Sequence, residues 1–455
     1  MSFAIISRLL SPLRVHQSPL SHLQFIFKIH TFSHQNPNCT EPTNPNPTQL
    51  DFNHTTVSET ITSYCNDHKR ALEFFNWVQE SSNFEHNTET FNRMIDILGK
   101  FFEFEKSWEL IETMRKRELS MPDRTTFRIM FKRYVSAHLV NEAIDVYENR
   151  IDGFGFKDEV SFCDLMDALC EYKHVVEAQE LWVKRKESVG FRDETKVYNM
   201  MLRGWSKLGW WGKCREFWEE MDRKGVAKDV VSYSIYMDIQ CKCNKPWKAV
   251  KLYKEMKRKR ISLDVVAYNT AVRAIGLSEG VDFSVRLYKE MMELGCKPNV
   301  ATYNVITKLF CDNGRMKEAC DVIREMRKRG CQPNVITYNC FFRSLVEPKK
   351  ILRLFEEMID GGLRPGLDTY VMLLRKFGNW GFLRPAFIVW DTMQRFGCSP
   401  DVSAYNALID VLVQKGMIDM AKKYDQEMLA KELAAKPRVE LGTKEASRDS
   451  GDVYL

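Results

Sequence analysis

Residues 298–304 read PNVATYN, and residues 333–339, which lie 35 positions further along the chain, read PNVITYN. A related phrase, DVVAYN, occupies residues 264–269, and its Asp264 stands 35 positions before Asn299. A motif that returns at a fixed interval of this size indicates a repeat protein, in which stacked units bury their apolar faces against each other. We therefore expect one elongated array in place of the several globular domains that 455 residues would otherwise suggest.

An aromatic residue marks every unit of this array. It stands at Phe91, Phe127, Phe162, Tyr198, Tyr233, Tyr268, Tyr303, Tyr338, Tyr370 and Tyr405. A methionine keeps the same interval at Met221, Met256, Met291, Met326, Met358, Met393 and Met428. The array therefore spans 88–436, and its ten units are 88–123, 124–158, 159–194, 195–229, 230–264, 265–299, 300–334, 335–366, 367–401 and 402–436. Residues 54–87 carry one helical pattern and are expected to form a degenerate N-terminal capping repeat.

The spacing inside a unit is helical. Tyr303, Ile306 and Phe310 follow the i, i+3, i+7 rule, and a second such run follows after the turn residues 312–314. Each unit is thus predicted to be a helical hairpin, and the chain to be all-α. Bulky residues three positions before the methionines alternate with small ones seven positions before, which favours close packing of neighbouring helices. The unit 335–366 lacks three residues, so we expect the turn near Pro348 to be tightened.

The two ends of the chain differ from the array. Residues 1–35 contain no acidic residue and mix Ser, Leu, Ile, Phe, Arg and His, which is typical of an organellar targeting peptide. We favour the mitochondrion, with the chloroplast, or a merely disordered N-terminus, as alternatives. Residues 36–53 are predicted to be a disordered linker and 437–455 a disordered tail. No run of about 18 apolar residues occurs, so no membrane span is expected.

Composition argues against several functions. The net charge of +6 is too small to indicate nucleic-acid binding by itself. The thirteen cysteines include no Cys-x-x-Cys pair, and Cys163, Cys170, Cys311 and Cys320 are read as small buried apolar residues. We therefore expect no metal site and no cofactor.

The residue that closes each unit is usually Asp or Asn. This column holds Asp123, Asp158, Glu194, Asp229, Asp264, Asn299, Asn334, Gly366 and Asp401. Side chains of this kind cap helix N-termini by accepting hydrogen bonds from unpaired backbone N–H groups. Helix capping explains most of the column without any ligand.

The residue directly after the aromatic one is a more specific signal. It is asparagine at Asn92, Asn199, Asn269, Asn304, Asn339 and Asn406, and serine at Ser234. Asparagine inside a helix costs roughly half a kcal/mol relative to alanine, so its recurrence points to a common partner. Amides aligned along one face suit an extended polymer with one polar edge per step, and single-stranded RNA is such a polymer.

These motifs resemble the pentatricopeptide repeat family of organellar RNA-binding proteins. The Val-x-Thr-Tyr-Asn phrase with a period of 35 and the Pro-Asn or Pro-Asp junctions carry the resemblance over residues 88–436. The resemblance implies a right-handed α-solenoid superhelix of about ten 35-residue helix-turn-helix repeats, with one base bound per repeat. It further implies that the residue after the aromatic and the last residue of the repeat read the base, while the second residue packs against it.

Carried onto this sequence, the resemblance implies a partial RNA code. Asn92 with Asp123 and Asn199 with Asp229 match uridine, Ser234 with Asp264 matches guanosine, and Asn269 with Asn299 and Asn304 with Asn334 match pyrimidines, more often cytidine. Asn339 belongs to the same column, and Val231, Val266, Ala301 and Ile336 are the spacers that flank bases. The expected core, 5′ to 3′, is U-G-pyrimidine-pyrimidine, from units 195–229 to 300–334. Other units depart from the pattern at Arg128, Cys163, Val371, Gly366, Lys436, Glu89, Lys196 and Asp368.

Alternative functions were weighed against RNA reading. Some relatives carry a deaminase-like domain, but its His-x-Glu and Cys-x-x-Cys motifs do not occur, so catalysis is not expected. A protein-binding scaffold of the tetratricopeptide kind fits less well, because its period is 34 and it lacks the amide column. A subunit of a mitochondrial ribosome or RNA-processing complex is a further alternative. The expected partner is a single-stranded organellar transcript, with RNA-processing or ribosomal proteins as possible additional partners.

Overall fold

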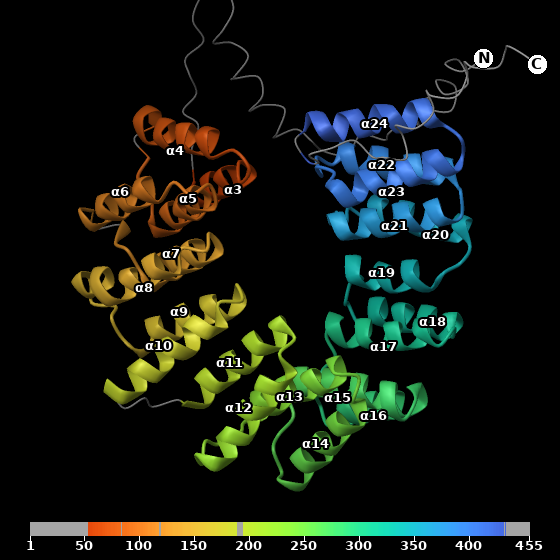
Figure 1. The fold of residues 1–455 in the computed structure, drawn as a ribbon, viewed down its shortest axis with the longest axis horizontal. Coiled ribbons are helices and arrows are strands. Elements are labelled where there is room, and N and C mark those ends of the chain that lie inside the picture. Colours follow the sequence, from red (N-terminus) through yellow and green to blue (C-terminus); the bar gives the residue numbers. More distant parts are fainter. Residues whose placement is uncertain (1–52, 83, 118–119, 189–193, 432, 434–455) are drawn as a thin grey trace, which may run out of the picture. The chain divides into compact units, whose positions relative to one another are not determined.

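The computed structural model describes residues 53–82, 84–117, 120–188, 194–431 and 433. The predicted targeting peptide and tail lie outside these residues, as does the predicted linker except for Asn53. Within the described ranges the chain is helical with connecting loops and contains no strand, so the prediction of an all-α helical-repeat solenoid is confirmed (Figure 1).

The helices follow one another in pairs. Their bounds are α3 (His54–Ser63), α4 (His68–Ser82), α5 (Thr88–Lys100), α6 (Phe104–Arg115), α7 (Arg124–Ser136), α8 (Val140–Asp145), α9 (Glu159–Glu171), α10 (Val175–Ser188), α11 (Glu194–Leu208), α12 (Trp211–Arg223), α13 (Val230–Lys242), α14 (Pro246–Arg258), α15 (Val265–Ser278), α16 (Val281–Glu293), α17 (Val300–Asp312), α18 (Met316–Lys328), α19 (Val335–Ser344), α20 (Pro348–Asp360), α21 (Leu367–Asn379), α22 (Leu383–Arg395), α23 (Val402–Gln414) and α24 (Ile418–Ala430). From α5 onward each odd-numbered helix packs against its even-numbered partner and against the odd-numbered helix of the next pair.

The repeated apolar residues form the interior of these pairs, as predicted. The ten marker aromatics are all at most 6% exposed, and the seven methionines at most 2%. Small residues such as Ala249 and Ala319 are fully buried beside them, and Tyr253 and Trp390 fill the matching large positions. Ile323 is the exception among the large positions, since it is only half-buried. The alternation of large and small side chains lets adjacent hairpins interlock.

The three residues that the unit 335–366 lacks are missing from its first helix, and not from the turn near Pro348 as predicted. The loop Leu345–Glu347 is three residues long, as is the corresponding loop Asn313–Arg315. The first helix is shorter instead, because α19 has 10 residues where α17 has 13. Three residues are close to one helical turn of 3.6, so the helix loses a turn and the connection is not tightened. Lys376 of α21 donates from Nζ to the carbonyls of Phe342 and Arg343, at 2.6 and 2.7 Å, and so satisfies acceptors at the shortened end.

Residues 54–87, in which the sequence shows one strong helical pattern, hold two helices, α3 and α4, so this segment is itself a helical pair. One further sequence prediction is corrected. Cys163, Cys170 and Cys311 are buried as predicted, but Cys320 is exposed. Cys320 follows the buried Ala319 on α18, and one residue step turns a helix by about 100° toward solvent.

His86 packs inside the N-terminal helical pair. Its ring is 1% exposed, stacks on Phe75 with centroids 3.7 Å apart, and donates from Nε2 to the Phe75 carbonyl at 2.9 Å. Burial lowers the pKa of His86 from 6.5 to about 4. The folded protein therefore keeps this imidazole neutral in a pH range in which the unfolded chain protonates it.

We expect the free energy of unfolding around α3–α5 to fall as pH drops from about 6.5 to about 4, because only unfolded His86 binds a proton in this window. One proton gives a slope of at most about 1.4 kcal/mol per pH unit. Urea denaturation at several pH values would measure it. His86→Phe should flatten the slope, whereas His138→Phe, at an exposed position, should not. An unchanged slope in His86→Phe would contradict this origin.

Candidate nucleic-acid interface

The closing Asp and Asn residues cap the helices that follow them. Each accepts a hydrogen bond from the backbone N–H three residues later, at 2.7–3.1 Å, in Asp123, Asp158, Asp229, Asp264, Asn299, Asn334 and Asp401. This confirms the capping prediction at seven junctions. Glu194 departs from it because it is already the first residue of α11, and Gly366 has no side chain to cap α21.

The amide column contacts the capping residue that closes its own unit and caps the first helix of the next one. Nδ2 of Asn92 donates to Asp123 at 3.1 Å, Nδ2 of Asn199 to Asp229 at 3.2 Å, Nδ2 of Asn269 to Asn299 at 3.4 Å, and Nδ2 of Asn304 to Asn334 at 3.2 Å. The structure thus brings together four of the five predicted pairs. In these four units the contact joins an odd-numbered helix to the start of the next odd-numbered one.

These contacts correct one step of the sequence argument. The asparagines were expected to need an external partner because they are unfavourable inside a helix. The structure provides an internal partner, the capping side chain of the following helix, which accounts for asparagine at these positions without a ligand. Three of these amides, Asn92, Asn199 and Asn304, are also buried, at 6–8% exposure. Any base that they contact therefore has to approach through the narrow opening between two units.

Two positions in the column behave differently. Ser234 donates to the Val230 carbonyl of its own helix at 2.7 Å, so it is not joined to Asp264 as predicted. The serine side chain is shorter than asparagine and bonds to its own helix. Asn339 lies in the unit that closes with Gly366, which has no side chain to accept, and its Nδ2 donates instead to Thr369 Oγ1 at 3.0 Å.

The amide oxygens fall into two groups. Oδ1 of Asn92 accepts a hydrogen bond from Thr126 Oγ1 at 2.7 Å, and Oδ1 of Asn304 accepts one from Thr337 Oγ1 at 2.6 Å. In Asn199, Asn269 and Asn339 the buried Oδ1 has no hydrogen-bond partner among the described residues. A buried acceptor without a donor costs about 1–3 kcal/mol, so these three oxygens favour any donor that reaches them.

The predicted spacers lie on the surface next to this row. Val266 and Ile336 are each 59% exposed, Ala301 is exposed and Val231 is half-buried. Val266 and Ile336, near the starts of α15 and α19, thus offer apolar contact area that the protein itself leaves uncovered.

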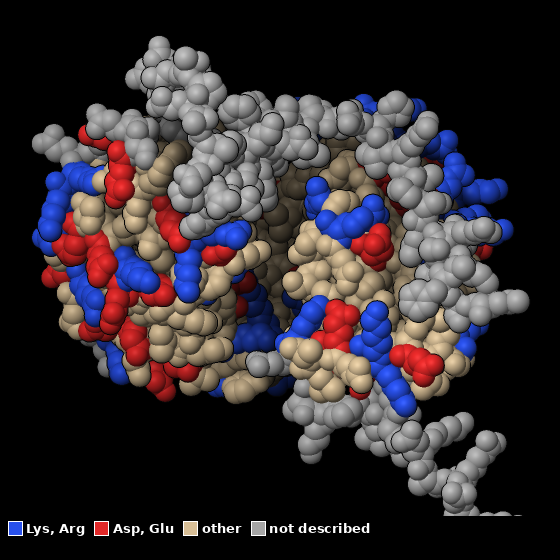
Figure 2. All heavy atoms as spheres, turned by 90° about the horizontal axis from the view of Figure 1, so that it is seen from above, with Lys and Arg blue, Asp and Glu red and all other residues tan. Residues whose placement is uncertain are grey.

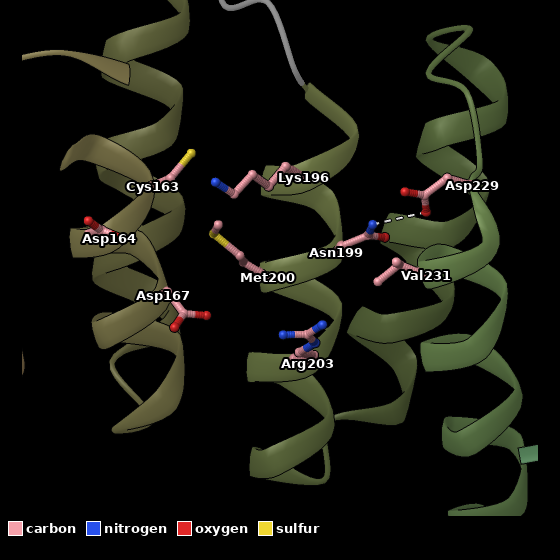
Figure 3. A pocket seen from close by; sticks show the side chains of 9 residues that line it. All are labelled: Cys163, Asp164, Asp167, Lys196, Asn199, Met200, Arg203, Asp229 and Val231. Atoms are coloured by element: carbon pink, nitrogen blue, oxygen red, sulfur yellow. Dashed lines mark hydrogen bonds between the residues drawn. The ribbon is translucent and has the colours of Figure 1, made fainter. Parts of the chain in front are cut away.

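A pocket of about 370 Å³ opens between α9, α11 and α13 (Figure 3). Its lining comprises Cys163, Asp164, Asp167, Lys196, Asn199, Met200, Arg203, Asp229 and Val231. The Asn199–Asp229 hydrogen bond lies at one side of the pocket, beside Val231. Three predicted site residues therefore share one polar opening.

Sequence reasoning missed part of this lining. Asp167 and Arg203 stand one helical turn after Cys163 and Asn199 and lie on the same helix faces. A search at i+4 from the amide column would have found them. The same position carries Asp96 and Asp238, which pair with Arg133 and Arg273 of the following odd-numbered helices, each at 2.7 Å. At these two positions the carboxylates therefore form ion pairs with the following unit.

Two of the capping carboxylates, Asp229 and Asp158, have a lowered pKa. Burial alone would raise the pKa of Asp229, but hydrogen bonds from the Ser232 backbone and side chain and from Asn199 outweigh it and lower the pKa. The guanidinium of Arg124 donates to Asp158 and, with further hydrogen bonds, lowers the pKa of that carboxyl to about 2. On the face shown in Figure 2, acidic and basic side chains are interspersed.

Two kinds of site have no support in the described part of the chain. No group of three or more His, Cys, Asp or Glu side chains there is arranged to hold a metal ion. None of the helices there is long and apolar enough to cross a bilayer.

Comparison with known proteins fits this architecture. Models described as PPR repeat family match residues 228–276 and 304–347, one described as pentatricopeptide repeat domain matches 353–415, and one described as PPR repeat matches 89–119, 196–226 and 403–433. A mitochondrial pentatricopeptide repeat-containing protein of Arabidopsis thaliana is 67% identical over 398 residues, which cover 87% of this chain and 89% of that protein. The chain belongs to the pentatricopeptide repeat family.

Two further pentatricopeptide repeat proteins are less similar to this chain. A second mitochondrial one from Arabidopsis thaliana is 33% identical over 389 residues, covering 84% of this chain and 67% of that protein. Among solved structures, the pentatricopeptide repeat protein PPR10 in complex with an 18-nt psaJ RNA element is 18% identical, with a TM-score of 0.40. That match covers 83% of this chain and 60% of PPR10, so this chain spans about three fifths of PPR10.

Proposed function

We propose that this protein binds a defined single-stranded RNA segment along its odd-numbered helices, in mitochondria and without catalysis. Binding acts on transcript processing, stability or translation: it protects the segment from exonucleases, exposes a start site, or recruits processing factors. The observation that carries the proposal is the recurrence of one polar contact, amide to capping residue, in four units of a pentatricopeptide repeat array.

Each amide–cap pair has hydrogen-bonding capacity left after its internal contact. An asparagine amide has two N–H donors and a carbonyl oxygen, and the contact with the cap uses one donor. At Asn199 and Asn269 the oxygen is unused, and Asp229 beside Asn199 is a charged acceptor. Uracil and cytosine present both donors and acceptors on their Watson–Crick edges, so an unstacked pyrimidine complements such a pair.

The exposed spacers supply the second part of the proposed site. A base that reaches an amide between two units passes the side chains at the second positions, such as Val266 and Ala301. Packing a base on protein side chains contributes roughly 1–3 kcal/mol. We assign Val231, Val266, Ala301 and Ile336 to this packing. Asn92, Asp123, Asn199, Asp229, Asn269, Asn299, Asn304 and Asn334 are assigned to base reading, and Ser234, Asp264 and Asn339 remain proposed readers that lack the repeated contact.

The mitochondrial location rests on two independent supports. The acid-free residues 1–35 have the composition of a targeting peptide, and both Arabidopsis relatives described above carry a mitochondrial name. Import of the radiolabelled full chain into isolated mitochondria, with protection from added protease, tests this part. Import into chloroplasts alone would overturn it.

Filter binding with the full chain tests the RNA-binding part. Single-stranded RNA that contains U-G-pyrimidine-pyrimidine should bind with a lower Kd than the same strand annealed to its complement, because pairing hides the base edges. Equal binding to single-stranded and duplex RNA would indicate attraction to phosphate alone and reject base reading.

A further inference from the structure

The capping boxes of two consecutive units differ in one contact. In both, a threonine at the third helical position bonds with the capping asparagine: Thr302 with Asn299, and Thr337 with Asn334. Thr302 Oγ1 lies 3.1 Å from Asn299 Oδ1 and makes no hydrogen bond to the amide of the preceding unit, Asn269. Thr337 Oγ1 lies 3.1 Å from Asn334 Oδ1 and also donates to Oδ1 of Asn304 at 2.6 Å.

The contact fixes the orientation of the Asn304 amide. The Thr337 hydroxyl is fully buried and Asn304 is 8% exposed, so the bond lies inside the protein. With Oδ1 on Thr337 and one Nδ2 hydrogen on Asn334, the amide is held in one orientation, and its second N–H is the donor left for a base. A rotation of 180° about χ2 would exchange Oδ1 and Nδ2, and would lose both the bond from Thr337 and the bond to Asn334.

The amide of Asn269 lacks this restraint. Its oxygen has no partner among the described residues, and its bond to Asn299 is the longest of the four, at 3.4 Å. Turning this amide breaks one weak hydrogen bond and can bring the oxygen to a donor. It can therefore offer a base either an acceptor or a donor. In the unit 88–123 the amide of Asn92 is restrained like that of Asn304, because Thr126 donates to its Oδ1.

We propose that Thr337 is a positioning residue that sets base specificity in the unit before its own. It holds the reading amide so that the second N–H is left for the base, and so sharpens the choice between cytidine, whose N3 accepts, and uridine, whose N3–H donates. Units without the contact, 195–229 and 265–299, discriminate less between the two pyrimidines. This inference rests on the proposed function and assigns a role to a residue outside the amide and capping columns.

The test compares Thr337→Val with the matched control Thr302→Val in the full chain. Both changes keep side-chain shape and remove a capping-box hydroxyl, since Asn299 and Asn334 each donate their backbone N–H to the threonine at 3.1 Å. Both variants lose this cap contact, and Thr337→Val also loses the bond to Asn304, so its thermal stability should fall further. Kd is measured by filter binding for four RNAs that carry cytidine or uridine at the third or the fourth position of U-G-pyrimidine-pyrimidine.

Thr337→Val should reduce the cytidine-to-uridine ratio at the fourth position about fivefold, which corresponds to one hydrogen bond, and Thr337→Ser should restore it. Thr302→Val should leave the ratio at the third position unchanged. Equal changes in both variants, or no change in Thr337→Val while RNA binding persists, would overturn the positioning role alone. A wild-type chain that binds none of the four RNAs would instead refute the proposed function and this inference with it.

Discussion

Asp229→Ala is expected to lower both the stability of the array and its affinity for single-stranded RNA. Asp229 caps α13 by accepting from the Ser232 N–H at 2.7 Å, and it accepts from Asn199 of the preceding odd-numbered helix, α11, at 3.2 Å. Loss of a cap costs about 1 kcal/mol, and loss of the bond to a charged acceptor costs about 1.5–3 kcal/mol more. We expect a decrease of about 3 kcal/mol in urea denaturation and a roughly tenfold weaker Kd in filter binding.

Asp401→Ala is the matched control for this change. Asp401 caps α23 by accepting from the Ala404 N–H at 2.8 Å, but the amide position on the preceding odd-numbered helix, α21, holds Val371, so no bond from an amide is lost. This variant should lose only the cap, about 1 kcal/mol, and keep its RNA affinity. Equal losses in the two variants would show that the Asn199–Asp229 contact contributes nothing.

The double substitution Asn269→Thr and Asn304→Thr should shift two adjacent base preferences from pyrimidine toward adenosine. Threonine is shorter than asparagine and leaves more room for a purine, and its hydroxyl can both donate to and accept from adenine. One hydrogen bond gained with adenosine and one lost with the pyrimidine amount to about tenfold at each position. Binding to RNAs with each base at the third and fourth positions measures the shift.

Circular dichroism provides the control for this double variant. Threonine and asparagine have similar helix propensities, so the helix content should not change. A uniform loss of affinity for all RNAs, with the pyrimidine preference preserved, would show that these amides support the fold and do not read bases.

The fold followed from the sequence because its determinants are local and repeated. The turn at Gly314, the caps such as Asn299, and the buried aromatic of each unit are all specified within one 35-residue period. The shortened α19 was misread for a physical reason. Sequence length shows how many residues are missing, but only packing decides whether a helix or a loop gives them up, and here the loop kept its three residues.

The candidate site was predictable only in part. Periodicity placed Asn199 and Asn304 in one column, but it did not show that their amides bond to the caps of the following helices. That contact joins residues 30 positions apart and depends on how closely two hairpins approach. The threonine contact is less predictable still, since Thr302 and Thr337 stand in nearly identical sequences and only Thr337 reaches an amide.

Selection of RNA from a randomised single-stranded pool by the full chain is the most direct test of the central claim, that the row of amide–cap pairs reads bases. The account predicts enrichment of U-G-pyrimidine-pyrimidine, with the uridine preference lost in Asp229→Ala and retained in Asp401→Ala. Enriched sequences that lack this core, or a core that Asp229→Ala leaves intact, would contradict it.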